Sequence, residues 1–82
     1  MVERATSLSE ELRQLVADVL ELEPDEIEDG ADFREVYDVD SLRVIEILAR
    51  IEKRYRVEIP ISELANMTNF SAVHQTVSRY AG

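Results

Sequence analysis

The sequence predicts an all-α protein: a small bundle of three main helices and one short helix, with a long loop between the first and second main helices. Apolar residues recur at three- and four-residue steps in three parts of the chain, which is the spacing of one face of a helix. Only 2 Gly and 2 Pro occur in 82 residues, which argues against a loop-rich or disordered chain. With 45% apolar residues the chain can build one core, and we expect a single domain over residues 1–82.

The first helix is expected to begin after Ser7 and to end before Pro24. Ser7 followed by Glu10 fits a capping box, in which each side chain binds the backbone N–H of the other residue. The helix then presents one apolar face, which consists of Leu8, Leu12, Leu15, Val16, Val19 and Leu22.

Residues 23–40 show no clean period and are expected to form a long loop, which in a compact domain is typically functional. Five apolar residues are spaced like anchors that dip into the core: Ile27, Phe33, Val36, Tyr37 and Val39. The carboxylates of the loop do not match a calcium-binding loop, because a pattern that starts at Asp25 places Val36 where the bidentate Glu should stand. We therefore expect a solvated acidic loop and no metal site.

Asp40 is a good N-cap for the second main helix, which is expected to run from Ser41 to about Tyr55. The short β-branched segment 57–60 ends at a proline, and residues 62–65 are expected to form one helical turn. The last helix should start between Thr68 and Ser71. Its inward-facing side chains are expected to be Phe70, Val73, Val77 and Tyr80.

Composition and charge exclude several classes of function. The absence of Cys rules out disulfides, thiolate metal sites and a cysteine nucleophile, and the only histidine, His74, is expected at the surface or its boundary. A net charge of −9 argues against nucleic acid or an anionic membrane as the partner. No apolar stretch approaches the roughly 20 residues of a membrane span, and none suggests a signal peptide, so we expect a cytoplasmic protein.

The charge is unevenly distributed along the chain. Residues 1–40 carry 14 acidic and 3 basic side chains, whereas residues 41–82 carry 4 acidic and 6 basic ones. At the boundary, Ser41 would stand at or beside the first residue of the second main helix, where unpaired N–H groups and the helix dipole favour a phosphate ester on its hydroxyl. The residues alone also allow a simpler interpretation, in which Asp40 and Ser41 only cap the helix.

Residues 33–42, Phe-Arg-Glu-Val-Tyr-Asp-Val-Asp-Ser-Leu, resemble the segment around the modified serine of acyl carrier proteins, and the chain resembles the discrete bacterial type of this family. The Asp-Ser-Leu triplet at 40–42 is the core of the likeness. The chain length, the acidity and the order of helices also match, as does the exit sequence Val-Glu-Ile-Pro at 57–60. The matching positions within the second main helix are Ile45, Glu46, Leu48, Glu52 and Tyr55.

The resemblance implies that a phosphopantetheinyl transferase esterifies Ser41 with 4′-phosphopantetheine from coenzyme A, and that the thiol of this arm holds an acyl group as a thioester. The protein would then be a carrier and not a catalyst. In the family, the residue at the position of Asp40 helps the transferase to recognise the site. Leu42 and the exposed face of the second main helix would meet the partner enzymes, which are expected to be an acyltransferase, a ketosynthase or an adenylating enzyme.

Some positions depart from the usual pattern of the family. Asp38 stands where the family usually has Gly, although Asp is one of the few residues that tolerate left-handed backbone angles, and Tyr37 stands where Leu is common. On a helical wheel the apolar arc of the second main helix consists of Val44, Ile47, Leu48, Ile51 and Tyr55, with Ile45 at its edge. The opposite arc is largely basic where the family usually shows acids, and consists of Arg43, Glu46, Arg50, Lys53 and Arg54.

Leu42 and Ala49 share one side of the wheel, off the centre of the apolar arc, so Leu42 is expected to be partly exposed. We predict that partner enzymes bind a mixed surface and that the acidic loop contributes to electrostatic steering. This surface consists of Leu42, Arg43, Glu46, Ala49, Arg50 and Lys53.

The basic helix face, Tyr37 and Asp38 favour polyketide or other specialised biosynthesis over housekeeping fatty acid synthesis. An aminoacyl or peptidyl carrier loaded by an adenylating enzyme is an alternative, although the paired glycines that such carriers often show are missing. An alternative of another class is a small helical interaction module in which Ser41 is never modified. We expect the protein to be a monomer.

Overall fold

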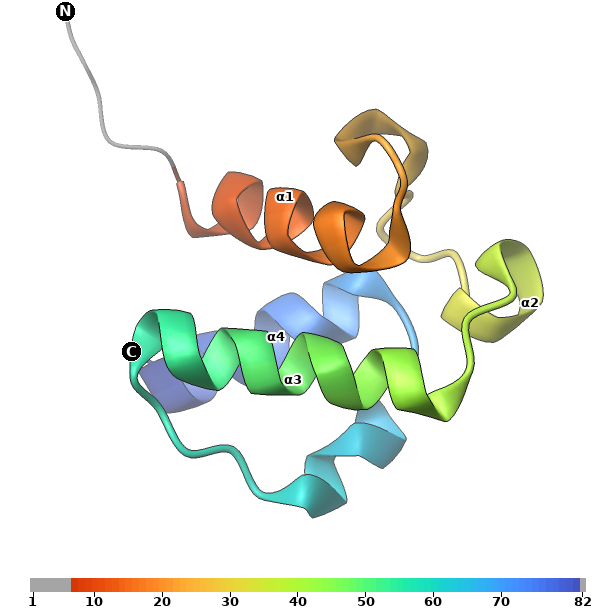
Figure 1. The fold of residues 1–82 in the computed structure, drawn as a ribbon. Coiled ribbons are helices and arrows are strands. Elements are labelled where there is room, and N and C mark those ends of the chain that lie inside the picture. Colours follow the sequence, from red (N-terminus) through yellow and green to blue (C-terminus); the bar gives the residue numbers. More distant parts are fainter. Residues whose placement is uncertain (1–6, 82) are drawn as a thin grey trace, which may run out of the picture.

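The computed structural model describes residues 7–81, and within these residues every regular element is a helix. The three main helices are α1 (Leu8–Leu20), α3 (Ser41–Tyr55) and α4 (Phe70–Ala81), and a short helix α2 (Phe33–Tyr37) precedes α3 (Figure 1). Two 3₁₀ helices, η1 (Pro24–Glu26) and η2 (Ile61–Asn66), lie in the connections. The prediction of an all-α bundle is confirmed, and α3 has the predicted bounds.

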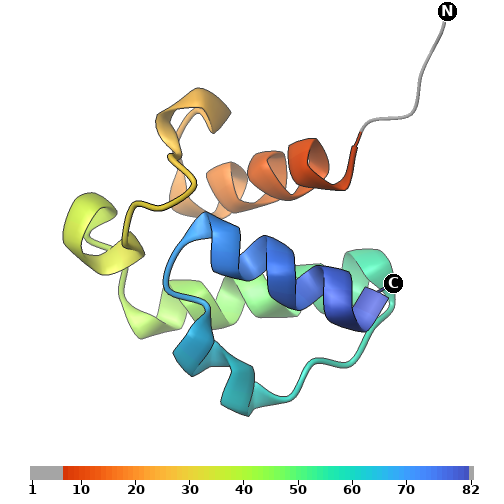
Figure 2. The same cartoon turned by 180° about the vertical axis from the view of Figure 1, so that it is seen from behind.

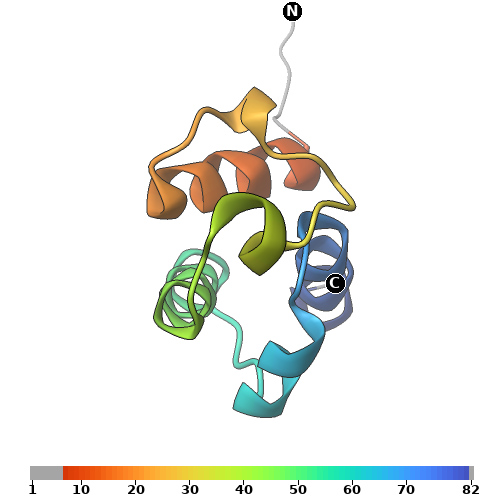
Figure 3. The same ribbon diagram turned by 90° about the vertical axis from the view of Figure 1, so that its right-hand side faces the viewer.

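The main helices surround one core. α1 packs against both α3 and α4, and η2 packs against the same two helices from the opposite side (Figures 1 and 2). The view along the bundle shows α2 lying across the end of the molecule at which α3 begins (Figure 3). Over residues 7–81, no helix has the length and apolar character that crossing a membrane requires.

The core consists of the apolar faces that the periodicity predicted, together with anchors from the connections. The main helices contribute Leu12, Leu15, Val16, Ala17 and Val19 from α1, Ile47, Leu48 and Ile51 from α3, and Phe70, Val73 and Val77 from α4. The connections contribute Ile27, Phe33, Val39, Ile59 and Met67. Ile45, at the edge of the predicted arc, is 40% exposed and is not a core residue.

The first helix begins as predicted but ends earlier. Ser7 Oγ accepts a hydrogen bond from the backbone N–H of Glu10 at 3.2 Å, and the Glu10 carboxylate accepts one from the N–H of Ser7, so the predicted capping box is present. α1 ends at Leu20 because Glu21 adopts left-handed angles (φ 60°), and Leu22 donates its N–H to the carbonyl of Ala17. Leu22 therefore packs against the core from beyond the helix.

The long loop is not without structure, because it contains both η1 and α2. The α2 helix is capped by Asp32, whose carboxylate accepts the N–H groups of Arg34 and Glu35. Within this single turn Phe33 and Tyr37 stand four residues apart and face inward, with their ring centroids 6.5 Å apart. Val36 was predicted to be a core anchor, and this was wrong: it is 59% exposed because the helical turn directs it outward.

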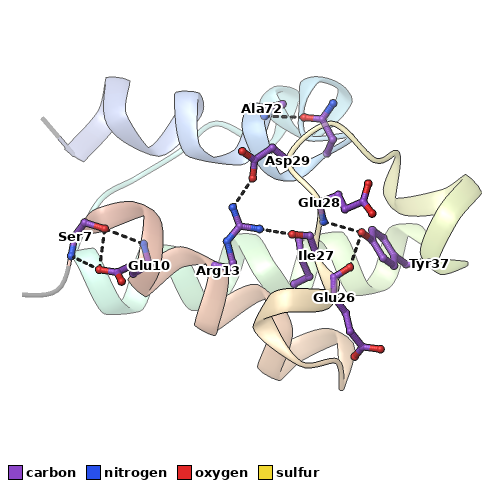
Figure 4. A network of polar contacts seen from close by, with 10 residues as sticks. Ser7, Glu10, Arg13, Glu26, Ile27, Glu28, Asp29, Tyr37 and Ala72 are labelled. Atoms are coloured by element: carbon purple, nitrogen blue, oxygen red, sulfur yellow. Dashed lines mark hydrogen bonds and ion pairs between the residues drawn. The ribbon is translucent and has the colours of Figure 1, made fainter.

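Arg13 of α1 ties the loop to the bundle (Figure 4). Its guanidinium donates hydrogen bonds to the carbonyl of Ile27 and to the carboxylate of Asp29, and its Cζ lies 4.2 Å from the ring centroid of Phe70. The carbonyl of Asp29 in turn accepts the N–H of Ser71 at the start of α4. The loop is thus held between α1 and α4 by polar contacts that the apolar spacing does not reveal.

A second polar cluster joins the end of α4 to η2. Tyr80 was predicted to face inward, but its side chain is 38% exposed, and its hydroxyl donates a hydrogen bond to Glu63 at 2.7 Å. Glu63 also accepts from the side-chain amide of Asn66 at 3.1 Å and forms an ion pair with Arg79. The phenol is therefore held at the rim of the core by its polar end.

This cluster predicts an acid-side dependence of stability. The hydrogen bond from Tyr80 is the main reason that the pKa of Glu63 lies below its ordinary value of 4.5, and Asn66 and Arg79 lower this pKa further. A lowered pKa in the folded state stabilises the fold above the ordinary pKa, and this stabilisation is lost as the pH falls through the lowered value. We expect Tyr80→Phe to raise the pKa of Glu63, as measured by an NMR titration of its carboxyl carbon. Equal midpoints in the variant and the wild type would contradict this role of Tyr80.

Candidate functional site

A three-residue connection between α2 and α3 sets the position of Ser41. Asp38 ends α2 in the left-handed conformation (φ 56°, ψ 40°), which the sequence allowed for at this position. The N–H of Asp38 donates to the carbonyl of Arg34, and the N–H of Val39 donates to that of Phe33, so the chain that leaves α2 folds back on the carbonyls of its first two residues. Val39 is buried, and the chain then enters α3 directly at Ser41.

The left-handed backbone angles of Asp38 predict how substitutions at this position change stability. Left-handed angles cost an ordinary L-residue roughly 1–2 kcal/mol, and a β-branched side chain fits them worst. Asp38→Val should therefore lower the free energy of unfolding by about 1–2 kcal/mol, whereas Asp38→Gly should not lower it. Urea denaturation of both variants measures the difference. If the Val and Gly variants are equally stable, the conformation of residue 38 does not govern this turn.

Asp40 caps α3, and the Ser41 side chain takes no part in the cap. The Asp40 carboxylate accepts the N–H of Arg43 at 3.0 Å, and the Asp40 carbonyl accepts the N–H of Val44. Ser41 is the first helical residue and is exposed. Its hydroxyl therefore lies beside the positive end of the α3 dipole and is accessible from solvent.

Arg34 contacts the Ser41 hydroxyl directly. The Nη2 atom of Arg34, in α2, donates a hydrogen bond to Ser41 Oγ at 2.9 Å. Arg34 belongs to the segment 33–42 around Ser41, but no role was predicted for it from the sequence. The contact spans seven residues and depends on α2, which the loop's sequence pattern did not predict.

A cleft opens beside Ser41. It has a volume of about 380 Å³ and lies between α2, α3 and η2. Its lining combines apolar side chains, of which Phe33 and Met67 are buried, with polar ones. The lining residues are Asp32, Phe33, Arg34, Ser41, Val44, Leu64, Ala65, Met67 and Thr68.

The outer face of α3 is less uniform than the wheel suggested. Leu42 is 70% exposed, in agreement with the prediction of partial exposure. Arg43 instead reaches back to α1, where its guanidinium donates to the carbonyl of Val19 at 2.7 Å and lies 3.8 Å from Glu21. Glu46 pairs with both Arg43 and Arg50 along the helix. Arg43 is therefore also a tether between two main helices.

An open groove of about 810 Å³ runs between α1 and α3. It includes four of the six residues predicted to bind partners, and Leu42 and Arg43 lie outside its lining. The lining residues are Gln14, Leu15 and Asp18 from α1, and Glu46, Ala49, Arg50, Lys53 and Arg54 from α3.

Comparison with known proteins decides the family. The family model described as the phosphopantetheine attachment site matches residues 10–77. The chain belongs to the acyl carrier protein family. Such carriers hold their cargo on a phosphopantetheine group and are not catalysts; they interact with pathway enzymes such as ketosynthases and acyltransferases.

Several acyl carrier proteins align with most of this chain. Polyketide-8 synthase acyl carrier protein 2 of Streptomyces avermitilis is 44% identical over 73 residues, which cover 89% of this chain and 84% of that protein. Polyketide-8 synthase acyl carrier protein 1 of the same organism is 42% identical over 72 residues, which cover 88% and 86%. An acyl carrier protein of Rhodococcus erythropolis is 37% identical over 57 residues, which cover 70% and 63%.

The residues around Ser41 fit the phosphopantetheine group of an acyl carrier protein. The group begins with a phosphate, and the hydroxyl of Ser41 lies between a guanidinium and the start of a 15-residue helix, both of which favour an anion. The rest of the group is a flexible chain with amides and methylenes, and the adjacent cleft offers the apolar walls of Phe33, Val44 and Met67. Arg34, Ser41 and this cleft would hold the group in the carrier.

The only histidine of the chain, His74, does not line the cleft beside Ser41. His74 is half-buried in α4, and its ring centroid lies 6.5 Å from that of Phe70. Across residues 7–81, no cluster of three or more His, Asp or Glu side chains has the geometry of a metal site.

Proposed function

We propose that this chain carries acyl intermediates of polyketide synthesis as thioesters on a 4′-phosphopantetheine arm attached to Ser41. The observation that carries this proposal is the exposed Ser41 hydroxyl at the N-terminus of α3, in a chain that belongs to the acyl carrier protein family. The two relatives that share 42–44% identity are named polyketide-8 synthase acyl carrier proteins, which supports polyketide intermediates as the cargo.

Each residue around the attachment point has a distinct proposed role. Ser41 Oγ forms the new ester bond to phosphorus as the phosphoanhydride of coenzyme A breaks; adenosine 3′,5′-bisphosphate leaves and the hydroxyl proton is released. Asp40 keeps the first turn of α3 formed and is a recognition residue for the phosphopantetheinyl transferase. When bound, the arm supplies the thiol that a chain with no cysteine lacks.

A direct experiment tests attachment. The protein is incubated with coenzyme A, Mg²⁺ and a promiscuous phosphopantetheinyl transferase, and its intact mass should rise by one phosphopantetheine. Trypsin cleaves after Arg34 and Arg43, and the resulting peptide 35–43 contains Ser41 as its only serine, so peptide mapping locates the group without ambiguity. Absence of any mass gain would contradict carrier function and leave the unmodified interaction module. An aminoacyl group on the arm isolated from cells would contradict polyketide cargo and favour the adenylating-enzyme alternative.

We further propose that partner enzymes bind the groove between α1 and α3 and the neighbouring Leu42. The groove brings Ala49, Arg50 and Lys53 to one open surface, and Leu42 exposes an apolar side chain close to the attachment point. In this proposal Arg43 has a smaller role than Arg50 and Lys53, because its guanidinium also donates a hydrogen bond to the carbonyl of Val19. The acidic residues of 21–40 contribute to steering at longer range.

Lys53→Glu tests this surface against a matched control. The variant should lower kcat/KM with the cognate ketosynthase or acyltransferase about twofold to fivefold, which corresponds to losing an exposed ion pair of up to ~1 kcal/mol. Arg56→Glu changes the net charge equally but lies beyond the end of α3 and outside the groove. Rates are measured at low and high salt, and the effect should shrink with salt. Equal rates for the two variants would contradict a partner site in the groove.

We also propose that the carrier acts as a monomer in the cytoplasm, where coenzyme A supplies the arm. Sedimentation equilibrium of the modified protein measures the oligomeric state. A dimer would contradict the monomer.

A further inference from the structure

Arg34 occupies an unusual electrostatic position. It is the only basic residue between Arg13 and Arg43, a stretch that contains eleven acidic residues. In the part of the chain that the structure describes, its guanidinium forms no ion pair with a carboxylate and instead donates to Ser41 Oγ. A cation that is not paired with its many acidic neighbours is available to another anion.

Phosphate attachment at Ser41 would place a new negative charge next to existing carboxylates. The ester oxygen of Ser41 follows the carboxylate of Asp40 directly and lies three residues after that of Asp38. Like charges this close destabilise one another. Arg34 Nη2 lies 2.9 Å from Ser41 Oγ, the atom that would become the ester oxygen, so this guanidinium is positioned to offset that charge.

The local structure holds Arg34 in place for this role. The preceding residue, Phe33, is 1% exposed and donates its N–H to the carbonyl of Thr68 at 2.8 Å, so α2 is anchored at its first turn. Asp32 caps that turn through the N–H of Arg34 itself. The planar guanidinium carries five donors in a fork that matches phosphate oxygens, so it can bind the ester oxygen and a second oxygen together.

We propose that Arg34 binds the phosphate of the attached arm and directs the arm from Ser41 towards the cleft between α2, α3 and η2. This inference rests on the proposed attachment at Ser41. Arg34 is a positioning residue: it touches the prosthetic group but takes no part in acyl transfer. In the unmodified protein the guanidinium donates a hydrogen bond to the neutral hydroxyl of Ser41. After modification it would donate to the charged phosphate, which makes a stronger hydrogen bond.

NMR of the wild-type protein before and after modification tests this contact. Mass spectrometry first shows whether the arm is attached; no attachment contradicts the proposed function itself. With the arm attached, the Nε–Hε resonance of Arg34 should shift, while that of Arg56, which lies beyond the far end of α3, should not. An unshifted Arg34 resonance in a fully modified sample would overturn the inference while leaving the carrier function intact.

A variant adds a second readout on the phosphorus atom. In modified Arg34→Gln, the ³¹P resonance should move from its wild-type position and narrow, because the phosphate is no longer held. Arg34→Lys should restore part of the shift, since it keeps the charge but not the fork. Modified Arg56→Gln is the matched control and should give the wild-type resonance. A ³¹P resonance of identical position and width in Arg34→Gln and in the wild type would also overturn the inference.

Discussion

Ser41→Ala should abolish phosphopantetheine attachment completely and leave the fold intact. Attachment requires a hydroxyl oxygen at this position, and alanine has none. The structure also explains why stability should survive, because the cap of α3 comes from the Asp40 carboxylate and not from Ser41. The variant loses one exposed hydrogen bond from Arg34, which costs about 1 kcal/mol or less. Alanine also has the highest helix propensity of all residues, which suits the first turn of α3.

Intact mass after incubation with coenzyme A and a transferase measures the loss. Ser62→Ala is the matched control, because Ser62 is another exposed serine near the start of a helical element, η2. This variant keeps Ser41 and should gain the same mass as the wild type. Helical circular dichroism and urea denaturation check that the Ser41 variant is folded. A mass gain in Ser41→Ala would show that another residue carries the group.

Phe33→Ala should produce the largest loss of stability of any change near the site. Phe33 is 1% exposed and is among the largest fully buried side chains, and it anchors the end of the long loop that precedes Ser41. Removing a buried Phe side chain costs about 3–5 kcal/mol, since transfer free energy is lost and a cavity remains. The free energy of unfolding of a small domain is about 5–15 kcal/mol, so this variant should unfold at a much lower urea concentration than the wild type.

Val36→Ala is the control for this prediction. Val36 belongs to the same turn of α2 but is 59% exposed, so its loss should change the free energy of unfolding by less than about 0.5 kcal/mol. Urea denaturation monitored by helical circular dichroism compares the two variants. Similar costs for both substitutions would mean that α2 is not anchored through Phe33.

The long elements and the candidate attachment point were predictable because their signals are local. The capping box at Ser7, the bounds of α3 and the N-cap at Asp40 each depend on residues within one or two helical turns. The same periodicity predicted most of the buried residues of the three main helices, although Tyr80 of α4 is exposed. The likeness around Ser41 is likewise contained in ten consecutive residues, and the match to the attachment-site family is consistent with it.

Short elements and side-chain contacts required the tertiary structure. The five residues of α2 are too few to show a helical period, so Val36 was predicted to be buried and Arg34 was not singled out. Arg43 is exposed as predicted, but its contact with α1 was not predicted, because a helical wheel contains no other helix and the acceptor, the carbonyl of Val19, lies 24 residues away.

The sequence alone therefore determined the class of fold, the main helices and the serine that presents its hydroxyl at a helix start, since local spacing and capping specify these. Only the tertiary structure decided what surrounds that serine. The contact from Arg34, the cleft beside Ser41 and the groove between α1 and α3 exist because packing of the core brings distant segments together.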